Sequence, residues 1–509
     1  MSYALRTRLL FSLLLACLAL GSSAAVAAFA PQDAQAESER IIVGQLSPHA
    51  FQNTVTDDPG ADLAAEEINL PQLLATLGPD ATLWYQHVLT LSNPFFEGRR
   101  PGLAGNRYAA DYIEFWFREY ALEPAFPGDV AADAGEPAVA QDGDAMEEGG
   151  APSNGMERED NVEVAGGEWV SYRQPFLPRN NETQATDNVG GVLRGRGDLA
   201  DQWVIIGAHY DHVGYGGRAQ DGPVNPGADD NASGTSAMLV LAKRLTEQYA
   251  AAGDDADLRS ILFMGFSAEE MGLLGSEHYV RNSTLPADRI SIMINLDMVG
   301  RLRGGNLMVG GVESAAGLLD LIKPRLLESG LTIYADPSGQ GPSDHAEFYG
   351  GGIPVLFFFT GTHAVYHRPG DVGPSVDPRG AAKVIELVHA IAWDRVSEPA
   401  MLTFSGVVRQ DAAGGPPRRP RATLGVVPGP VADGGQPGVR ISILSESSPA
   451  AKAGLKVEDI IVAWNGEPLT NIMALQMRLR SASPGDEVTL TIKRGDEQFD
   501  TKVTLGERN

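Results

Sequence analysis

The sequence contains a single cysteine, Cys17, among its 509 residues. This cysteine lies in an amino-terminal segment that is expected to be removed, so the mature chain is expected to contain no thiol. Disulfides and thiolate metal ligands are therefore excluded. Any metal site must be built from His, Asp and Glu side chains.

Basic residues are also scarce, because 39 Lys and Arg stand against 66 Asp and Glu and give a formal net charge of −27. No nucleic-acid partner is expected, since a protein that binds nucleic acid needs positive charge to neutralise phosphates. No membrane span is expected either. The apolar run LLFSLLLACLAL at 9–20 is shorter than the roughly 20 residues that a membrane-spanning helix needs.

The residues on both sides of that run are typical of a cleaved secretory signal. Arg6 and Arg8 precede it, and small residues that end in Ala28-Phe29-Ala30 follow it. We therefore interpret 1–30 as a signal peptide and expect an exported protein, periplasmic or secreted. The sequence Leu14-Leu15-Ala16-Cys17 also resembles a lipoprotein processing site, so a lipid anchor at Cys17 is the alternative to cleavage near Ala30.

The next part of the chain is expected to be helical and is then interrupted. Apolar residues at helical spacing predict helices at Gln72–Leu91 and Asn106–Tyr120. Residues 127–160 contain ten acidic residues against one arginine and almost no side chain suited to a core. They are interpreted as a disordered surface insertion, and an acidic regulatory segment is the alternative.

From Asn188 to Trp393 apolar strands alternate with helical segments. The predicted strands are GGVLRG, WVIIGAH, SILFMGFS, ISIMINLD, NLMVGG and PVLFFFT. Continuous apolar strands between helices predict an α/β fold with a mostly parallel sheet that is flanked by helices on both faces. The domain is expected to occupy 31–397.

Four of the predicted central strands are each followed by His, Asp or Glu. The carboxyl ends of parallel strands are where ligands bind in open α/β sheets, so these side chains are expected to lie together. Asp211 lies in the loop after the strand that ends at His209, and Asp229 and Asp230 lie in a second loop that ends at the start of a helix. The candidates are His209, Asp211, Asp229, Asp230, Glu269, Glu270, Asp297, His363 and His367.

The adjacent carboxylates of Glu269 and Glu270 suit two different roles at one site. Side chains that are neighbours at a strand end point in different directions, so one can bind a metal while the other faces the attacking water. The alternative is that both lie in a solvated first helical turn, where the helix dipole favours acidic residues.

Taken together, the motifs HxD, GADDNASG, AEE, NLD and YHRPGD resemble those of the di-zinc peptidases, which include secreted bacterial leucyl aminopeptidases and glutamate carboxypeptidase. The segments EGRRPGLAGNRYAADYI and SDHAEF add to the resemblance, which covers Leu91 to Trp393. It implies two zinc ions per chain. Asp230 would bridge them, His209 and Asp297 would complete one site, and Glu270 and His367 would complete the other.

The resemblance also implies roles for three further residues. Asp211 would accept the second ring N–H of His209 and fix the orientation of the imidazole. Glu269 would be the general base that accepts a proton from water and returns it to the leaving amine. Tyr366 would help to stabilise the oxyanion.

Two assignments stay open at this point. Asp229 could replace Asp230 as the bridge, although the second aspartate of GADDNASG matches the family ligand. His363 and His367 are four residues apart and could share a helical face, although His367 occupies the family's Tyr-His position.

Two further histidines match no family ligand, and one arginine departs from the family pattern. His212 and His345 match no ligand and are expected in the surroundings of the metals. Arg368 stands where the family usually has threonine, which would alter the pocket rim but leave the metal ligands unchanged.

The carboxyl-terminal part resembles a bacterial PDZ domain at 422–508, after a linker at 398–421 that is rich in Pro, Gly and Arg. In such a domain Leu424, Gly425 and Val426 would offer backbone N–H groups to a peptide carboxylate, and the next strand would add the peptide to the sheet edge. The alternative is a domain that only packs against the peptidase.

These expectations define a metallo-exopeptidase, an exported zinc aminopeptidase that acts on peptides and has a PDZ module for C-terminal peptides or for regulation. Carboxypeptidase or glutaminyl cyclase chemistry on the same fold is the first alternative. A non-catalytic receptor or scaffold is the second.

Overall fold

The computed structural model describes residues 40–43, 69–128, 169–178, 185–216, 222–302, 304–406, 421–429, 438–444, 448–469, 475, 478–479, 482–495 and 497–508. The predicted signal peptide with Cys17 lies outside these ranges, as does the acidic segment from 129 to 160. Within the described ranges, no helix is both long enough and apolar enough to cross a membrane.

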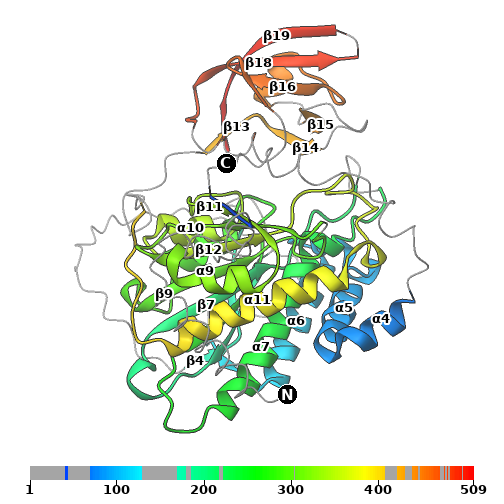
Figure 1. Cartoon of the computed structure of the whole chain (residues 1–509). Coiled ribbons are helices and arrows are strands. Elements are labelled where there is room, and N and C mark those ends of the chain that lie inside the picture. The colour runs from blue at the N-terminus through cyan, green and yellow to red at the C-terminus, as the bar shows by residue number, and fades with distance from the viewer. Residues whose placement is uncertain are drawn as a thin grey trace, which may run out of the picture.

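A ten-stranded sheet organises the first domain (Figure 1). Its order is β1 (Ile41–Val43), β11 (Thr332–Asp336), β10 (Asn306–Gly310), β12 (Val355–Phe359), β9 (Ile290–Leu296), β7 (Trp203–His209), β8 (Ser260–Phe266), β6 (Thr186–Leu193) and β2 (Glu123–Pro124), and β5 (Arg173–Phe176) pairs with β6. The central strands β12, β9, β7 and β8 are mutually parallel. β6 and β10 join them in antiparallel pairs. The predicted α/β class with a mostly parallel sheet is confirmed.

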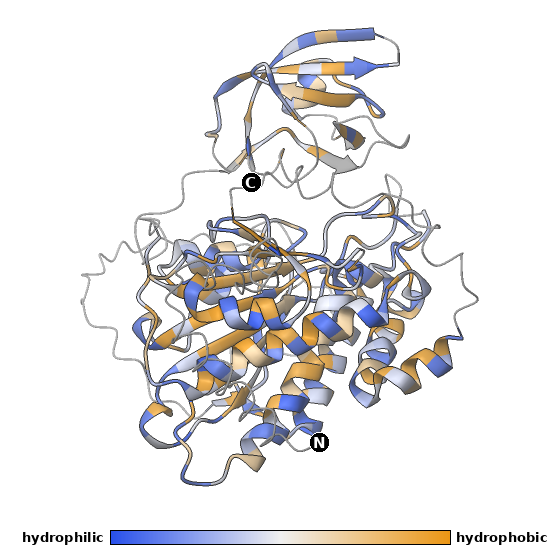
Figure 2. Cartoon of the chain, in the orientation of Figure 1, coloured by the Kyte–Doolittle hydropathy of each residue, from blue (hydrophilic) through white to orange (hydrophobic). Residues whose placement is uncertain are grey.

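The central strands are buried along their whole length because helices cover both faces of the sheet. Side chains alternate between the faces of a strand, and in β7 Val204 and Ile206 face one core while Ile205 faces another. The first core includes residues of α5 (Pro79–Leu91), α6 (Ala104–Glu119), α7 (Gly234–Ala251), α9 (Leu318–Glu328) and α11 (Pro378–Ser397). The second includes residues of α8 (Leu274–Arg281) and α10 (His345–Gly350). Figure 2 shows these strands as mostly hydrophobic, between helices that each have a polar side.

Two features of this domain differ from the sequence prediction. The helix predicted at Gln72–Leu91 is divided into α4 (Leu70–Leu77) and α5, because Gly78 has a φ of 95° and Pro79 begins the second helix. The strands β1 and β11 were not predicted. β1 has only three residues and pairs with β11, so its strand character depends on a partner far along the chain.

The carboxyl-terminal domain contains a second, antiparallel sheet. Its order is β14 (Val426–Gly429), β15 (Val439–Leu444), β16 (Ile460–Trp464), β18 (Glu487–Arg494) and β19 (Glu497–Thr504), with β17 (Glu467–Pro468) paired to β16. Nearby, β13 (Arg421–Thr423) pairs with β20 (Gly506–Arg508), and α12 (Pro449–Lys452) packs beside β19. In the first domain, β3 (Phe126–Pro127) and β4 (Trp169–Ser171) form a further small pair.

The first part of the predicted linker packs against the first domain, on α10 and on the loop before α9. Ala316 N–H donates to the Thr403 carbonyl, and the Phe404 ring lies 5.2 Å from that of Tyr349. Residues up to 406 are therefore joined to the first domain, and 407–420 lie outside the described residues.

Candidate metal centre

The chemistry-bearing residues converge at one edge of the sheet because four adjacent parallel strands end there. His209 is the last residue of β7, and Asp297 follows β9 directly. Glu269 and Glu270 follow β8, and His367 lies in the loop after β12. Asp230 enters from the turn before α7.

Two groups of donor atoms form around Asp230. In the first, His209 Nε2 lies 3.6 Å from Asp230 Oδ1 and 3.4 Å from Asp297 Oδ1. In the second, His367 Nε2 lies 3.0 Å from Asp230 Oδ2 and 3.0 Å from Glu270 Oε2. The two oxygens of Asp230 thus face different groups, which is the geometry of a bridging carboxylate.

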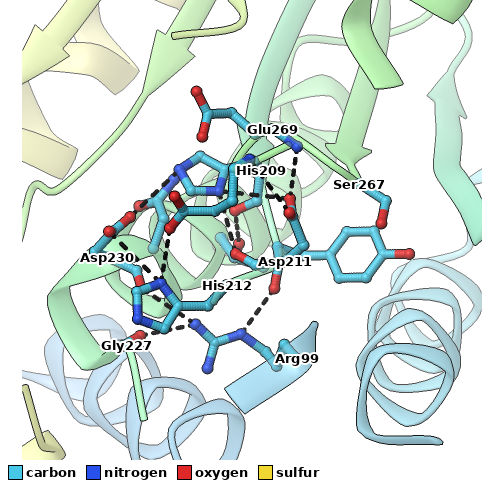
Figure 3. Close-up of polar contacts among 12 residues, drawn as sticks. Arg99, His209, Asp211, His212, Gly227, Asp230, Ser267 and Glu269 are labelled. Atoms are coloured by element: carbon cyan, nitrogen blue, oxygen red, sulfur yellow. Dashed lines mark hydrogen bonds and ion pairs between the residues drawn. The ribbon is translucent and has the colours of Figure 1, made fainter. Parts of the chain in front are cut away.

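The second group contains His212, which sequence reasoning placed only in the surroundings of the metals. Its Nδ1 lies 2.9 Å from Glu270 Oε1 and 3.5 Å from Asp230 Oδ2. Figure 3 shows contacts from Asp230 to the rings of both His209 and His212. In contrast, His345 is in neither group, and its ring stacks on Phe357.

These residues fit zinc in both chemistry and spacing. The donor atoms of each group lie within 4.8 Å of one another. Two atoms bound to one zinc ion at about 2.0–2.2 Å in a tetrahedral arrangement lie about 3.3–3.6 Å apart, and imidazole and carboxylate are zinc ligands. Asp230 Oδ2 and His367 Nε2 are also buried with no hydrogen-bond partner among the described residues, as expected of atoms that would bind a cation.

The structure resolves the choice between the two aspartates. Asp229 Oδ1 accepts the Gly300 N–H at 2.8 Å, and Oδ2 lies 3.4 Å from His363 Nε2. Asp229 and His363 therefore pair with each other away from both donor groups, and Asp230 is the aspartate of this turn that belongs to them. Burial acts to raise the pKa of Asp229, but His363 and Arg301 outweigh it and hold the pKa below its usual value.

Asp211 contacts both His209 and the turn that carries the two glutamates. His209 Nδ1 lies 3.2 Å from the Asp211 backbone carbonyl, which is in place to accept the second ring N–H, and 3.7 Å from the carboxylate Oδ1. The carboxylate also accepts the backbone N–H groups of Glu269 at 3.0 Å and Glu270 at 3.4 Å. Two N–H donors on one carboxylate make charge-assisted hydrogen bonds, so Asp211 ties the Glu269–Glu270 turn to the end of β7.

Glu269 is held by its backbone N–H, and its carboxylate has no hydrogen-bond partner among the described residues. Figure 3 shows its N–H bound to Asp211 and its carboxylate directed away from that contact. Burial raises the pKa of this carboxyl well above its usual range, and the charges of Glu270, Asp344 and Asp297 add to the increase. A glutamate with a raised pKa is suited to accept a proton.

Arg99, from the EGRR segment, is a structural residue of the site to which sequence reasoning gave no role. Its guanidinium is fully buried and donates to the carbonyls of Tyr210, Leu91, Pro226 and Gly227 at 2.7–2.8 Å. These bonds join the opening segment to the loops on both sides of the metal centre (Figure 3). Burial lowers the pKa of Arg99 to about 10, against the charges of Asp230, Asp371, Asp211 and Glu270.

Tyr366 connects the metal centre to the carboxyl-terminal domain. Its ring stacks on His367 at 3.8 Å. It also packs against the apolar core of the second domain and against a small cluster of the first domain, which consists of Met298, Met308, Tyr334, Phe357 and Phe359. Burial raises the pKa of Tyr366 well above its usual value, so its hydroxyl stays protonated. Next to His367, Arg368 has its pKa lowered by burial and by the charge of Arg440 in β15.

The predicted peptide-binding turn of the second domain is described from Leu424 to Val426. Leu424 is fully buried, and Val426 begins β14, which is the first strand in the sheet order. Gly425 has a φ of +68°, and its N–H donates to Thr423 Oγ1 at 3.0 Å. That N–H is therefore already bonded, and capture of a peptide carboxylate at this turn stays a prediction.

Comparison with known proteins agrees with this organisation. The family model for peptidase family M28 matches residues 188–392, and that for the PDZ domain matches 422–505. Aminopeptidase YwaD of Bacillus subtilis is 31% identical over 225 residues, which cover 42% of this chain and 46% of that protein. The match thus spans less than half the length of this curated relative.

Two solved structures match over nearly their whole length. BSAP, a zinc aminopeptidase from Bacillus subtilis, is 22% identical with a TM-score of 0.44, and the match covers 65% of this chain and 99% of that one. Porphyromonas gingivalis glutaminyl cyclase is 20% identical with a TM-score of 0.45, over 62% and 98% of the two chains. The segment 188–392, which holds both donor groups, thus matches peptidase family M28, and the segment that follows it at 422–505 matches the PDZ domain.

Proposed function

We propose that this chain is an exported zinc-dependent aminopeptidase that holds two zinc ions and removes N-terminal residues from peptides. The observation that carries the proposal is Asp230, whose oxygens face His209 Nε2 at 3.6 Å and His367 Nε2 at 3.0 Å. Glu269 directly precedes Glu270, which is a member of the second donor group, and its own carboxylate belongs to neither group.

The donor groups define which residues would hold the metals. His209, Asp230 and Asp297 would hold one zinc ion, and Asp230, Glu270 and His367 would hold the other. When bound, such ions polarise a peptide carbonyl and lower the pKa of the attacking water toward about 7. Glu269 would accept a proton from the attacking water and donate it to the nitrogen of the scissile peptide bond, which leaves as the new N-terminal amine of the shortened peptide.

Two arginines near the site bear on the choice between aminopeptidase and carboxypeptidase action. Arg99 and Arg301 are buried and bonded to carbonyls, or to Asp371, so neither is offered to the free carboxylate of a carboxypeptidase substrate. This supports aminopeptidase over carboxypeptidase action.

The second domain would bind or orient longer peptides. β14 is an edge strand, because in the described part of the chain only β15 pairs with it, and an extended peptide can add to such an edge. Export is proposed from the basic, apolar and small-residue pattern of residues 1–30. The mass of the mature chain purified from the natural host would test cleavage near Ala30.

A substrate panel tests the activity directly. The zinc-loaded protein would be assayed on aminoacyl and N-acetylated versions of the same peptides, on C-terminally amidated peptides and on an N-terminal glutaminyl peptide. We expect release of the N-terminal residue from free and amidated peptides and none from the acetylated ones. Cleavage that requires a free C-terminus would indicate a carboxypeptidase, and loss of ammonia from the glutaminyl peptide without hydrolysis would indicate a cyclase.

A further inference from the structure

His212 is a third imidazole at the metal centre, beyond the two histidines that the proposed function uses. It lies in the loop after β7, one residue beyond Asp211, and it is fully buried. It belongs to the same donor group as Asp230, Glu270 and His367. Its Nδ1 pairs with Glu270 Oε1, whereas Nε2 is buried without a hydrogen-bond partner among the described residues. A buried imidazole with one unpaired nitrogen requires an explanation, because burial of an unpaired polar atom costs free energy.

The position of Nδ1 is that of a donor atom to a shared ion. It lies 2.9 Å from Glu270 Oε1 and 3.5 Å from Asp230 Oδ2, so it approaches both carboxylates of the second group. His367 Nε2 stands in the same relation to these residues, at 3.0 Å from each. The His212 and His367 rings lie 5.4 Å apart at 72°, so the two imidazoles approach from different directions.

The surrounding backbone leaves the His212 ring little room to move. A Cβ at Gly227 would lie 2.6 Å from His212 Cγ and Cδ2, and Gly227 has a φ of +58° that favours glycine. The Gly227 carbonyl accepts from Arg99 Nη2 at 2.8 Å, and the His212 backbone N–H donates to the Arg99 carbonyl. Meanwhile Nε2 is buried without a hydrogen-bond partner in the described part of the chain, so the ring is positioned by packing and by its Nδ1 contacts.

We propose that His212 binds the second metal through Nδ1, as a fourth protein ligand beside Asp230, Glu270 and His367. This inference rests on the proposed zinc centre and adds to it a difference between the two sites. Four protein donors close a zinc site, whereas the His209, Asp230 and Asp297 group has three and leaves a position open. The second site is therefore the tighter one, and substrate binds on the side of His209.

Zinc-edge X-ray absorption of protein loaded with one equivalent of zinc tests the proposal. We expect the ion to occupy the second site and to show two imidazoles, those of His212 and His367. A single imidazole in the wild-type protein would overturn the proposal, because the ion would then occupy either the second site without His212 or the first site, which would not be the weaker one. This measurement requires no variant, so the result does not depend on a mutant that folds.

Variants give a second readout. In His212→Gln we expect one imidazole instead of two and a loss of affinity for the first zinc equivalent beyond the ~10–100-fold that outer-shell changes cause. His345→Gln is the matched control, since it replaces another buried histidine outside both donor groups and should leave the imidazole count unchanged. An unchanged count in His212→Gln would also refute the proposal. Neither readout requires peptidase activity, so failure of the proposed function would leave this result interpretable.

Discussion

Replacement of Glu269 by glutamine removes a proton acceptor but no atom of either donor group. The Glu269 backbone N–H is held by Asp211 at 3.0 Å, and among the described residues its carboxylate makes no hydrogen bond that the replacement would break. Glutamine has nearly the same shape, so the turn that carries Glu270 should stay in place. We therefore expect Glu269→Gln to fold normally and to bind zinc as the wild-type protein does.

The size of the expected fall in kcat follows from the proposed role of Glu269 as the general base. General acid–base catalysis contributes about 10²–10⁴-fold to a rate, which corresponds to about 3–5 kcal/mol of the activation barrier. We expect kcat to fall by that factor while KM changes little, because the amide leaves the donor groups intact. The acidic limb of the pH profile of kcat/KM should disappear, since that limb reports ionisation of the essential base.

The assay combines zinc content with hydrolysis of an aminoacyl substrate. Glu270→Gln is the contrasting variant and should lose zinc, because Glu270 Oε2 lies 3.0 Å from His367 Nε2 in the second donor group. Glu277→Gln is the neutral control, because this carboxylate on α8 pairs with Arg281 and belongs to neither group. Retention of wild-type turnover in Glu269→Gln, with full zinc content, would refute the general-base role.

Asp230, the second domain and the buried His87 each give one further prediction. Asp230→Ala should release both zinc ions together on dialysis, because one carboxylate serves both donor groups, and retention of one tightly bound ion would show that Asp230 is not the bridge. Removal of 407–509 should leave hydrolysis of dipeptide-sized substrates within a few-fold of normal while it raises KM for longer peptides; equal loss on both, in folded protein, would show that contact of the second domain with Tyr366 shapes the centre. Burial lowers the pKa of His87 to about 3, against about 6.5 in the unfolded chain, so the free energy of unfolding should fall as pH drops below 6.5 and His87 should account for about 2 kcal/mol of that fall at pH 5. Denaturant unfolding of His87→Gln at pH 7.5 and 5 should show a correspondingly smaller decrease, and an identical decrease would contradict this account.

Much of the fold was predictable because its signals are local. The runs at β7, β8 and β9 are apolar at every position or nearly so, which is expected only of strands covered on both faces. Breaks in periodicity were harder to predict, and the division between α4 and α5 depends on the backbone at Gly78. The short strand β1 could not be predicted, because three residues carry no pattern without the partner β11.

The composition and the motifs by themselves limit the chemistry of the site. Cleavage of the predicted signal peptide would remove Cys17, the single cysteine, and leave only nitrogen and oxygen ligands. Parallel strands that end in His, Asp or Glu bring those ligands to one edge. The residue types and the edge of the sheet therefore follow from local sequence alone, because the period of a strand and the direction of a parallel sheet are set by the backbone.

Tertiary structure decided which of these residues face one another. Asp229 and Asp230 are neighbours in sequence, and only packing of the turn against Gly300 and His363 directs the first away and leaves the second between the donor groups. The roles of His212 and of Arg99 likewise depend on loops that are distant in sequence, as in the bonds from Arg99 to Tyr210 and Gly227. Side-chain direction in a turn depends on long-range contacts, so periodicity does not give it, and only the resemblance of GADDNASG to the family motif favoured Asp230 beforehand.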